Sequence, residues 1–177
     1  MELVEGVTLT DFVAPNGVDI IKIPENVVQI IIKQSLLAVN YLHTNKIAHR
    51  DLKLDNLMIE GFNKEEPKKY DADKFRLKLI DFGLSKFKEA GANLNTGCGT
   101  LDYMPPEILQ KKAYDFGCDM WALGVIAYIL ICGTPPFYDE KDKVVINNIK
   151  MIKFEFDDPV WDTVSSECKD WIDSILI

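Results

Sequence analysis

The chain has 177 residues, of which 47% are hydrophobic and 27% charged, and its formal net charge is −8. This length and composition describe a globular domain, or part of one, that can bury a substantial core. The acidic balance argues against nucleic acid as a partner, because no surplus of Lys and Arg is available to neutralise phosphates.

The N-terminal part of the chain contains the first predicted helix. Residues 1–6 lack a basic stretch followed by an apolar run, so we expect no signal peptide. Proline and an acid at residues 23–25 mark a helix start. Apolar residues then recur at helical spacing, which predicts an amphipathic helix from Glu25 to about His43, with Asn45 as a left-handed cap.

The middle of the chain reads as a β-hairpin followed by a loop. Two short apolar runs, Leu57–Ile59 and Leu77–Ile80, are separated by a polar segment from Glu60 to Arg76. This pattern predicts two strands with an exposed connection. The stretch at 91–99, rich in Gly, Asn and Thr, predicts a loop.

The C-terminal half is predicted to be helical, with helices at Pro106–Gln110, Asp119–Cys132, Asp142–Met151 and Ser166–Ile175. The apolar run from Trp121 to Cys132 is shorter than the roughly 20 residues that span a bilayer. A short helix that is apolar on every side belongs in the centre of a protein. We therefore predict an α+β fold that is mainly α with a small β-ribbon, and no membrane partner.

The four cysteines, at 98, 118, 132 and 168, show no C-x-x-C spacing, and the chain has only two histidines. A zinc site is not expected, and reduced thiols in a cytoplasmic protein are the simplest interpretation. Cys98 stands in a polar, glycine-flanked stretch. It is either an exposed reactive thiol or, by default, an inert one.

Five segments in a fixed order carry the functional prediction. Residues 49–56 read H-R-D-L-K-L-D-N and match the pattern H-R-D-L-x-x-x-N at every fixed position, and D-F-G follows a predicted strand at 81–83. Residues 99–107 read G-T-L-D-Y-M-P-P-E, with P-P-E where A-P-E is usual. D-M-W-A-L-G and C-G-T-P-P-F then open and close the apolar helix. In this order the segments resemble protein kinases over essentially the whole chain.

The resemblance implies a protein-kinase-like fold of which only part is present. Residues 1–10 resemble the hinge between the two kinase lobes, and residues 11–177 resemble the larger C-terminal lobe. No G-x-G-x-x-G loop occurs, so the N-lobe sheet is expected to be missing. The arginine that normally pairs with Glu107 would lie beyond Ile177. We expect a truncated kinase domain, incomplete at its C-terminal end and nearly inactive alone.

The resemblance also assigns catalytic roles and implies ATP and Mg²⁺. Asp51 would accept the proton of the substrate hydroxyl, and Lys53 would contact the γ-phosphate. Asn56 and Asp81 would bind Mg²⁺ through oxygen atoms. Thr100 would hydrogen-bond the lysine–aspartate pair and favour Ser/Thr acceptors. Taken singly, residues such as these aspartates are more often turn or capping residues.

Four further residues are expected to have structural roles. His49 follows an apolar helix, so it is more readily a core histidine than a ligand, and the resemblance has it pack against Phe82. Asp119 is either an N-cap or the anchor of the catalytic-loop backbone, and the two roles are compatible. Glu107, without its arginine, would destabilise the lobe if it were buried and unpaired.

Other residues are expected to bind nucleotide. The backbones of Glu2 and Val4 would meet adenine, with Met58 beneath the ring. Thr8 stands where related kinases often have a glutamate that contacts ribose or a basic substrate residue. A preference for basic substrates is therefore not implied, although the acidic surface would suit one.

Regulation is suggested by residues 94–100, 132–140 and 154–161, which resemble the calcium/calmodulin-dependent kinases and relatives with attached calcium-binding domains. Arg50 would pair with a phosphorylated activation loop, in which Thr96 is either phosphorylated or an unmodified loop residue. The chain contains no EF-hand pattern and no basic amphipathic helix. A calcium sensor, either calmodulin or an attached EF-hand domain, would lie outside this chain.

The predicted function is ATP- and Mg²⁺-dependent phosphorylation of Ser or Thr in protein substrates by a larger parent protein. The alternative is a non-catalytic, pseudokinase-like or docking lobe, which would have no need of Asp51, Lys53, Asn56 and Asp81 together. A small-molecule kinase is disfavoured by the activation segment that ends at Glu107.

Overall fold

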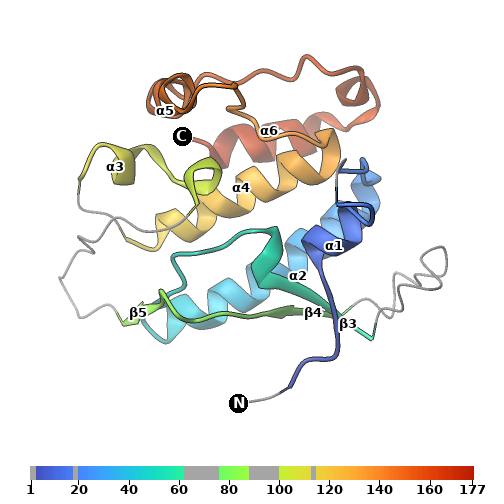
Figure 1. The fold of residues 1–177 in the computed structure, drawn as a ribbon, viewed down its shortest axis with the longest axis vertical. Coiled ribbons are helices and arrows are strands. Elements are labelled where there is room, and N and C mark those ends of the chain that lie inside the picture. The colour runs from blue at the N-terminus through green and yellow to red at the C-terminus, as the bar shows by residue number, and fades with distance from the viewer. Residues whose placement is uncertain (1–2, 18–19, 62–75, 88–99, 113–114) are drawn as a thin grey trace.

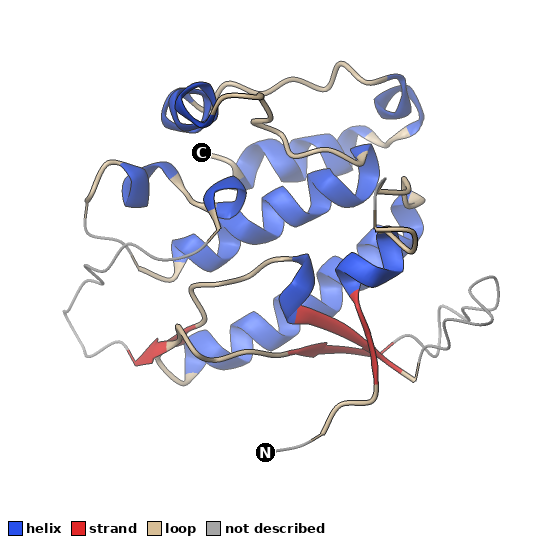
Figure 2. Cartoon of the chain, in the orientation of Figure 1, coloured by secondary structure: helices blue, strands red, loops and turns tan. Residues whose placement is uncertain are grey.

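The computed structural model describes residues 3–17, 20–61, 76–87, 100–112 and 115–177. These residues form a mainly helical structure with two small β elements on one side (Figures 1 and 2). In chain order the elements are β1 (Gly6–Thr8), α1 (Leu9–Val13), α2 (Glu25–Thr44), β2 (Ile47–Ala48), β3 (Leu57–Glu60), β4 (Arg76–Leu79), β5 (Lys86–Phe87), α3 (Pro106–Leu109), α4 (Gly117–Cys132), α5 (Asp142–Met151) and α6 (Ser166–Ile175). Short 3₁₀ turns occur at Leu54–Asn56, Leu101–Tyr103 and Pro159–Thr163.

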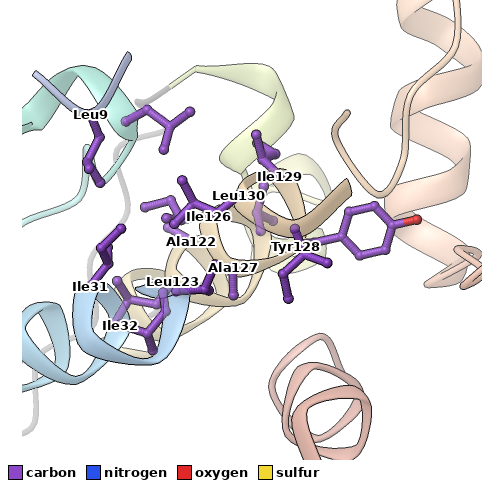
Figure 3. Packing of buried hydrophobic residues seen from close by; sticks show 14 of the residues in the cluster. Leu9, Ile31, Ile32, Ala122, Leu123, Ile126, Ala127, Tyr128, Ile129 and Leu130 are labelled. Carbon is purple, nitrogen blue, oxygen red and sulfur yellow. The ribbon is translucent and has the colours of Figure 1, made fainter. Parts of the chain in front are cut away.

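Helix α4 is the centre of the hydrophobic core, as its apolar sequence predicts. Nearly all of its 16 residues are buried, and it contacts both α2 and α6 (Figure 1). Figure 3 shows Ile32 of α2 next to Leu123 of α4, and both belong to the same buried cluster. Each fully buried Leu or Ile side chain stabilises the fold by about 1.5–3 kcal/mol. The packing around α4 therefore holds the other helices in place.

No described helix combines the length and the apolar character that crossing a membrane requires.

The close packing of α4 on α6 depends on Gly124. A Cβ atom at this position would lie 2.9 Å from side-chain carbons of Ile175 and Leu176. Alanine improves helix propensity by up to about 1 kcal/mol, but overpacking a filled core costs about 1–3 kcal/mol. We expect Gly124→Ala to lower the free energy of unfolding in urea. Leu176→Ala should cost less stability in that background than in the wild type, and an unchanged or raised stability of Gly124→Ala would contradict the prediction.

The predicted hairpin is confirmed, since β3 and β4 pair antiparallel with Leu57 opposite Leu79. Strand β1 adds to the other edge of β3, with Thr8 opposite Met58, which gives the order β1-β3-β4. Residues 6–8, expected within a hinge, are therefore part of a sheet, and α1 follows them directly. A separate ribbon pairs β2 with β5 and places Ile47 opposite Phe87.

The predicted left-handed cap at Asn45 is wrong. Helix α2 runs to Thr44, but Asn45 has φ −86° and ψ 12°, and the left-handed residue is Lys46 at φ 64°. The Asn45 side chain instead donates from Nδ2 to the carbonyl of Tyr41 at 2.8 Å. The side-chain amide of Asn45 thus caps a helix carbonyl, and the left-handed backbone follows one residue later, at Lys46.

Glu25, at the start of α2, joins this helix to the N-terminus of α6. Its carboxylate accepts hydrogen bonds from the backbone N–H of Ser165 at 2.8 Å and from the Ser165 hydroxyl. These bonds favour the charged form, the backbone bond most of all, and lower the pKa of Glu25 from its ordinary value of 4.5. Glu25 therefore stabilises the fold in its ionised state.

We expect Glu25→Gln to flatten the pH dependence of stability in mildly acidic solution. Because the folded-state pKa is below the unfolded value, the contribution of Glu25 is complete above about pH 4.5 and is lost as the pH falls through the folded-state pKa. The free energy of unfolding, measured in urea between about pH 3 and 6, should rise less steeply with pH in the variant. Parallel profiles for the two proteins would contradict this role.

Candidate active site

The loop between β2 and β3 brings a carboxylate, an ammonium and an amide together. Lys53 Nζ lies 3.2 Å from Asp51 Oδ2, and Asn56 Nδ2 donates to the Asp51 carbonyl at 2.7 Å and to Oδ2 at 3.1 Å. Leu52 and Leu54 are buried beneath the loop. Because neighbouring side chains of an extended segment point to opposite sides, burial of the two leucines directs Asp51 and Lys53 outward.

Asp119 anchors this loop from inside α4. Its side chain is fully buried, Oδ2 accepts from the N–H of His49 at 2.9 Å, and Oδ1 accepts from the N–H of Arg50 at 2.8 Å. Helix α4 begins at Gly117, so Asp119 lies within the first turn and is not the N-cap. A buried carboxylate requires such donors, because an uncompensated charge in the core is very costly.

His49 links the loop to the segment before D-F-G. Its buried ring makes a hydrogen bond from Nε2 to the carbonyl of Ile80 at 3.0 Å, and the Asp51 N–H approaches Nδ1 at 3.4 Å. A carbonyl only accepts and a backbone N–H only donates, so these contacts fit the neutral tautomer protonated on Nε2. The ring also meets Phe82 edge-on, with centroids 5.1 Å apart.

Asp81 lies two residues after the end of β4 and directly follows Ile80, whose carbonyl is hydrogen-bonded to His49. The N–H of Ile80 donates to the carbonyl of Asn56 at 2.9 Å, which joins the two predicted Mg²⁺-binding segments. Asp81 itself is exposed, and its Oδ1 accepts from the N–H of Gly83 at 3.0 Å. No direct bond between the Asp81 and Asn56 side chains occurs within the described ranges.

Two residues of the site have left-handed backbone conformations, Arg50 at φ 73° and Asp81 at φ 58°. For residues other than glycine this region is strained and tends to occur where surrounding contacts determine the backbone. Here the surrounding contacts are the bonds of Arg50 to Asp119 and of Ile80 to Asn56. The strain therefore lies on the two residues that flank the Asp51 cluster.

Thr100 and Glu107 lie on the activation-segment side. Thr100 lines a small cavity together with Arg50 and Asp51, but among the described residues no hydrogen bond joins its side chain to Asp51 or Lys53. Glu107 is only partly buried, and its carboxylate has no ion-pair partner in the described part of the chain. The charge of Glu107 is one of the contributions that raise the pKa of Cys118, after burial and the charge of Asp119.

The structure describes only some of the residues that are predicted to contact nucleotide. Thr8 and Met58 are neighbours across β1 and β3, and the Thr8 hydroxyl caps α1 by accepting from the Asp11 N–H at 3.0 Å. Val4 precedes β1 and is partly buried. Glu2 lies outside the described residues, as do Thr96 and Cys98.

The described cysteines, Cys118, Cys132 and Cys168, are free thiols. Burial raises the pKa of Cys168 to about 11, and burial followed by the charge of Asp119 raises the pKa of Cys118. A raised thiol pKa leaves little thiolate at neutral pH, so these two cysteines are poor nucleophiles.

The oxygen donors of the site suit a hard cation. Nδ2 of Asn56 donates to Asp51, and no described donor bonds its Oδ1. The sequence predicts this oxygen and the Asp81 carboxylate as the two protein ligands of the cation. Within the described ranges no group of three or more His, Cys, Asp or Glu side chains forms a metal centre. Mg²⁺ is commonly held by one or two protein oxygens plus water and phosphate, so an amide and a carboxylate are a sufficient protein contribution.

One residue of this network, His43, was not singled out from the sequence. It stands in the last turn of α2, and its Nε2 lies 2.8 Å from Asp119 Oδ2. Its only sequence signal is a polar residue at the end of an amphipathic helix, six residues before His49, which does not reveal a contact with α4.

Comparison with known proteins gives one consistent result. A family model described as a protein kinase domain matches residues 1–177. Calcium/calmodulin-dependent protein kinase type 1 of Caenorhabditis elegans and type 1B of Homo sapiens are each 42% identical to the chain over 176 residues. The match covers 99% of this chain and 47% of each relative, so the chain spans about half the length of the curated relatives it matches.

Proposed function

Because the chain belongs to the protein kinase family, among the serine/threonine kinases of the calcium/calmodulin-dependent group, we propose that the protein containing it transfers the γ-phosphate of ATP to Ser or Thr residues of protein substrates. The observation that carries the proposal is the contact of Asp51 with both Lys53 and Asn56. Asp81 is joined to this cluster through the Ile80–Asn56 backbone bond.

The proposed reaction needs few covalent steps from the protein. The substrate hydroxyl oxygen forms a bond to the γ-phosphorus while the bond from that phosphorus to the β–γ bridging oxygen breaks, and ADP leaves. Asp51 accepts the hydroxyl proton. Lys53, 3.2 Å from Asp51, brings a positive charge to the place where the transferred phosphoryl group carries negative charge. Thr100, which lines the same small cavity as Asp51, is proposed to orient the acceptor.

Mg²⁺, when bound by Oδ1 of Asn56 and the carboxylate of Asp81, supplies neutralisation of the phosphate charges. The protein residues prepare that site. Asp51 holds the Asn56 amide through two hydrogen bonds, and the Ile80–Asn56 bond fixes the segment that carries Asp81. We propose that adenine contacts Val4, Met58 and Glu2, with Thr8 beside them. Glu2 lies outside the described residues.

We propose that residues 11–177 correspond to the larger lobe of the kinase and residues 1–10 to the connection between lobes. The printed sequence contains no G-x-G-x-x-G loop to cover the phosphates. That loop, and the lysine that accompanies it in kinases, would come from elsewhere in the protein. The 177 residues alone are then expected to be nearly inactive.

The partners proposed are a protein substrate and a calcium sensor that acts outside these residues, because the relatives are named calcium/calmodulin-dependent kinases. Arg50 is proposed to bind phosphorylated Thr96 through charge-assisted hydrogen bonds. The free thiols and the use of ATP suit the cytoplasm.

The test joins residues 1–177 to the N-terminal lobe of the Caenorhabditis elegans relative and measures transfer of labelled phosphate from Mg-ATP to a generic Ser/Thr protein substrate. We expect transfer by the fusion and almost none by the 177 residues alone. Titration calorimetry with Mg-ATP runs in parallel. A folded fusion that neither binds nor transfers would contradict the proposal and favour a docking lobe, whereas transfer to a small molecule alone would favour a different kinase class.

A further inference from the structure

His43 reaches the catalytic loop through one intermediate carboxylate. Its Nε2 lies 2.8 Å from Asp119 Oδ2, and the exposed fractions of the two side chains are 17% and 0%. The same Oδ2 accepts from the His49 N–H, and Oδ1 accepts from the Arg50 N–H. A side chain of α2 therefore shares an acceptor with the residue two positions before Asp51.

The position of the His43 ring is fixed on two sides. An ionised carboxylate only accepts hydrogen bonds, so the contact with Asp119 requires a proton on Nε2. The ring also stacks on Phe116, with centroids 4.5 Å apart and 27° between the planes. These contacts restrain the ring in the position from which it can donate to Asp119.

The surroundings of this contact are largely apolar. His43 lines a cavity of about 630 Å³ between α2, α4 and α6, whose walls include Met120, Ala127 and Trp171. A hydrogen bond to a charged group is stronger where water is scarce, and a buried charge that loses a donor is correspondingly penalised. His43 is therefore well placed to hold the carboxylate in one orientation.

We propose that His43 is a positioning residue for the phosphoryl transfer proposed above. By donating to Oδ2 it restrains the Asp119 side chain, and the two oxygens of Asp119 restrain the backbone of His49 and Arg50. That backbone leads directly to Asp51. Without the His43 donor, the carboxylate can rotate and the loop loses its fixed geometry. This inference rests on the proposed function for its catalytic part only.

The first test needs no catalysis. In the 177-residue chain, His43→Phe keeps an aromatic ring against Phe116 but removes the donor. We expect hydrogen exchange of the His49 and Arg50 amides to accelerate roughly 10- to 100-fold, the range that loss of a hydrogen bond to a charged group implies. His43→Gln, with an amide N–H near the Nε2 position, should restore most of the protection.

Two comparisons make the exchange result specific. Asn40→Ala changes a residue on the same helix that lines the same cavity, and it should leave the two amides unaffected. The amide of Leu130, in the core of α4, serves as an internal reference. The proposal is overturned if His43→Phe leaves the two amides as in the wild type, or if it accelerates Leu130 to the same extent, which would indicate general loss of stability.

The second test uses the fusion with the N-terminal lobe. His43→Phe should lower kcat roughly tenfold with the KM for ATP changed less than twofold, and His43→Gln should recover most of kcat. Equal kcat for the wild type and His43→Phe would contradict the catalytic part. Failure of the proposed function itself is recognised separately, because the wild-type fusion would then show no phosphate transfer while the exchange result for His43→Phe would stand.

Discussion

Asp51→Asn is expected to lower kcat for phosphoryl transfer by roughly 10²–10⁴-fold in the fusion that carries an N-terminal lobe. The amide has almost the volume of the carboxylate but cannot take the hydroxyl proton. It can also keep contact with Asn56, which donates to both the carbonyl and Oδ2 of residue 51. The free energy of unfolding should therefore change little, and the loss should appear in turnover.

Asp55→Asn provides the matched control for this experiment. Asp55 undergoes the same chemical change four residues further along the loop, but its side chain is exposed. Its kcat should remain close to that of the wild type. Steady-state transfer of labelled phosphate to a Ser/Thr substrate measures both variants. Full turnover by Asp51→Asn would mean that another group takes the proton.

Asp119→Ala is expected to lower the free energy of unfolding by about 2–5 kcal/mol. The substitution leaves the N–H groups of His49 and Arg50 without their acceptor, and each unpaired buried donor costs about 1–3 kcal/mol. Loss of the carboxylate also removes the partner of His43. Unfolding in urea, with the slope of the transition held as a check on two-state behaviour, measures the change.

Two further substitutions serve as comparisons for the stability loss of Asp119→Ala. Asp173→Ala removes an exposed carboxylate from α6 and should change stability by no more than about 0.5 kcal/mol. Asp119→Asn keeps the shape and one good acceptor, so it should lie between Asp119→Ala and the wild type. A loss below about 1 kcal/mol for Asp119→Ala would show that the carboxylate does not hold the loop.

The core of the fold could be predicted because its sequence patterns are long. An apolar run as continuous as Trp121–Cys132 has few places other than the centre of a domain. Helix α2 was predicted to within a residue from its periodicity, and its observed bounds are Glu25–Thr44. The error at Asn45 arose because asparagine can cap a helix with either its backbone or its side chain, and residue type alone does not decide which.

The smaller elements could not be predicted, because strands of two or three residues carry no periodic signal. Strands β2 and β5 form because the segment before Asp51 pairs with the segment after Asp81. This pairing depends on the tertiary fold. The same holds for the left-handed backbone at Arg50, since arginine has no preference for that region.

The candidate site was predicted as a set of residue types, but not as a network. The motif spacing indicated Asp51, Asn56 and Asp81, and their roles remain predictions. Whether Asp119 acts as a cap, an anchor or both depended on where α4 starts. Because the helix begins two residues earlier, the carboxylate faces the loop. His43 was missed because its partner is 76 residues away.

The almost complete enclosure of α4 has a consequence for biosynthesis. On the ribosome, residues 117–132 emerge before the α6 segment that covers one side of them, so an apolar surface is exposed to solvent during translation. Chaperone capture at this stage should therefore target the α4 segment. Slowing translation while α4 is outside the ribosome and α6 is still inside the exit tunnel should increase the fraction of nascent chains that aggregate.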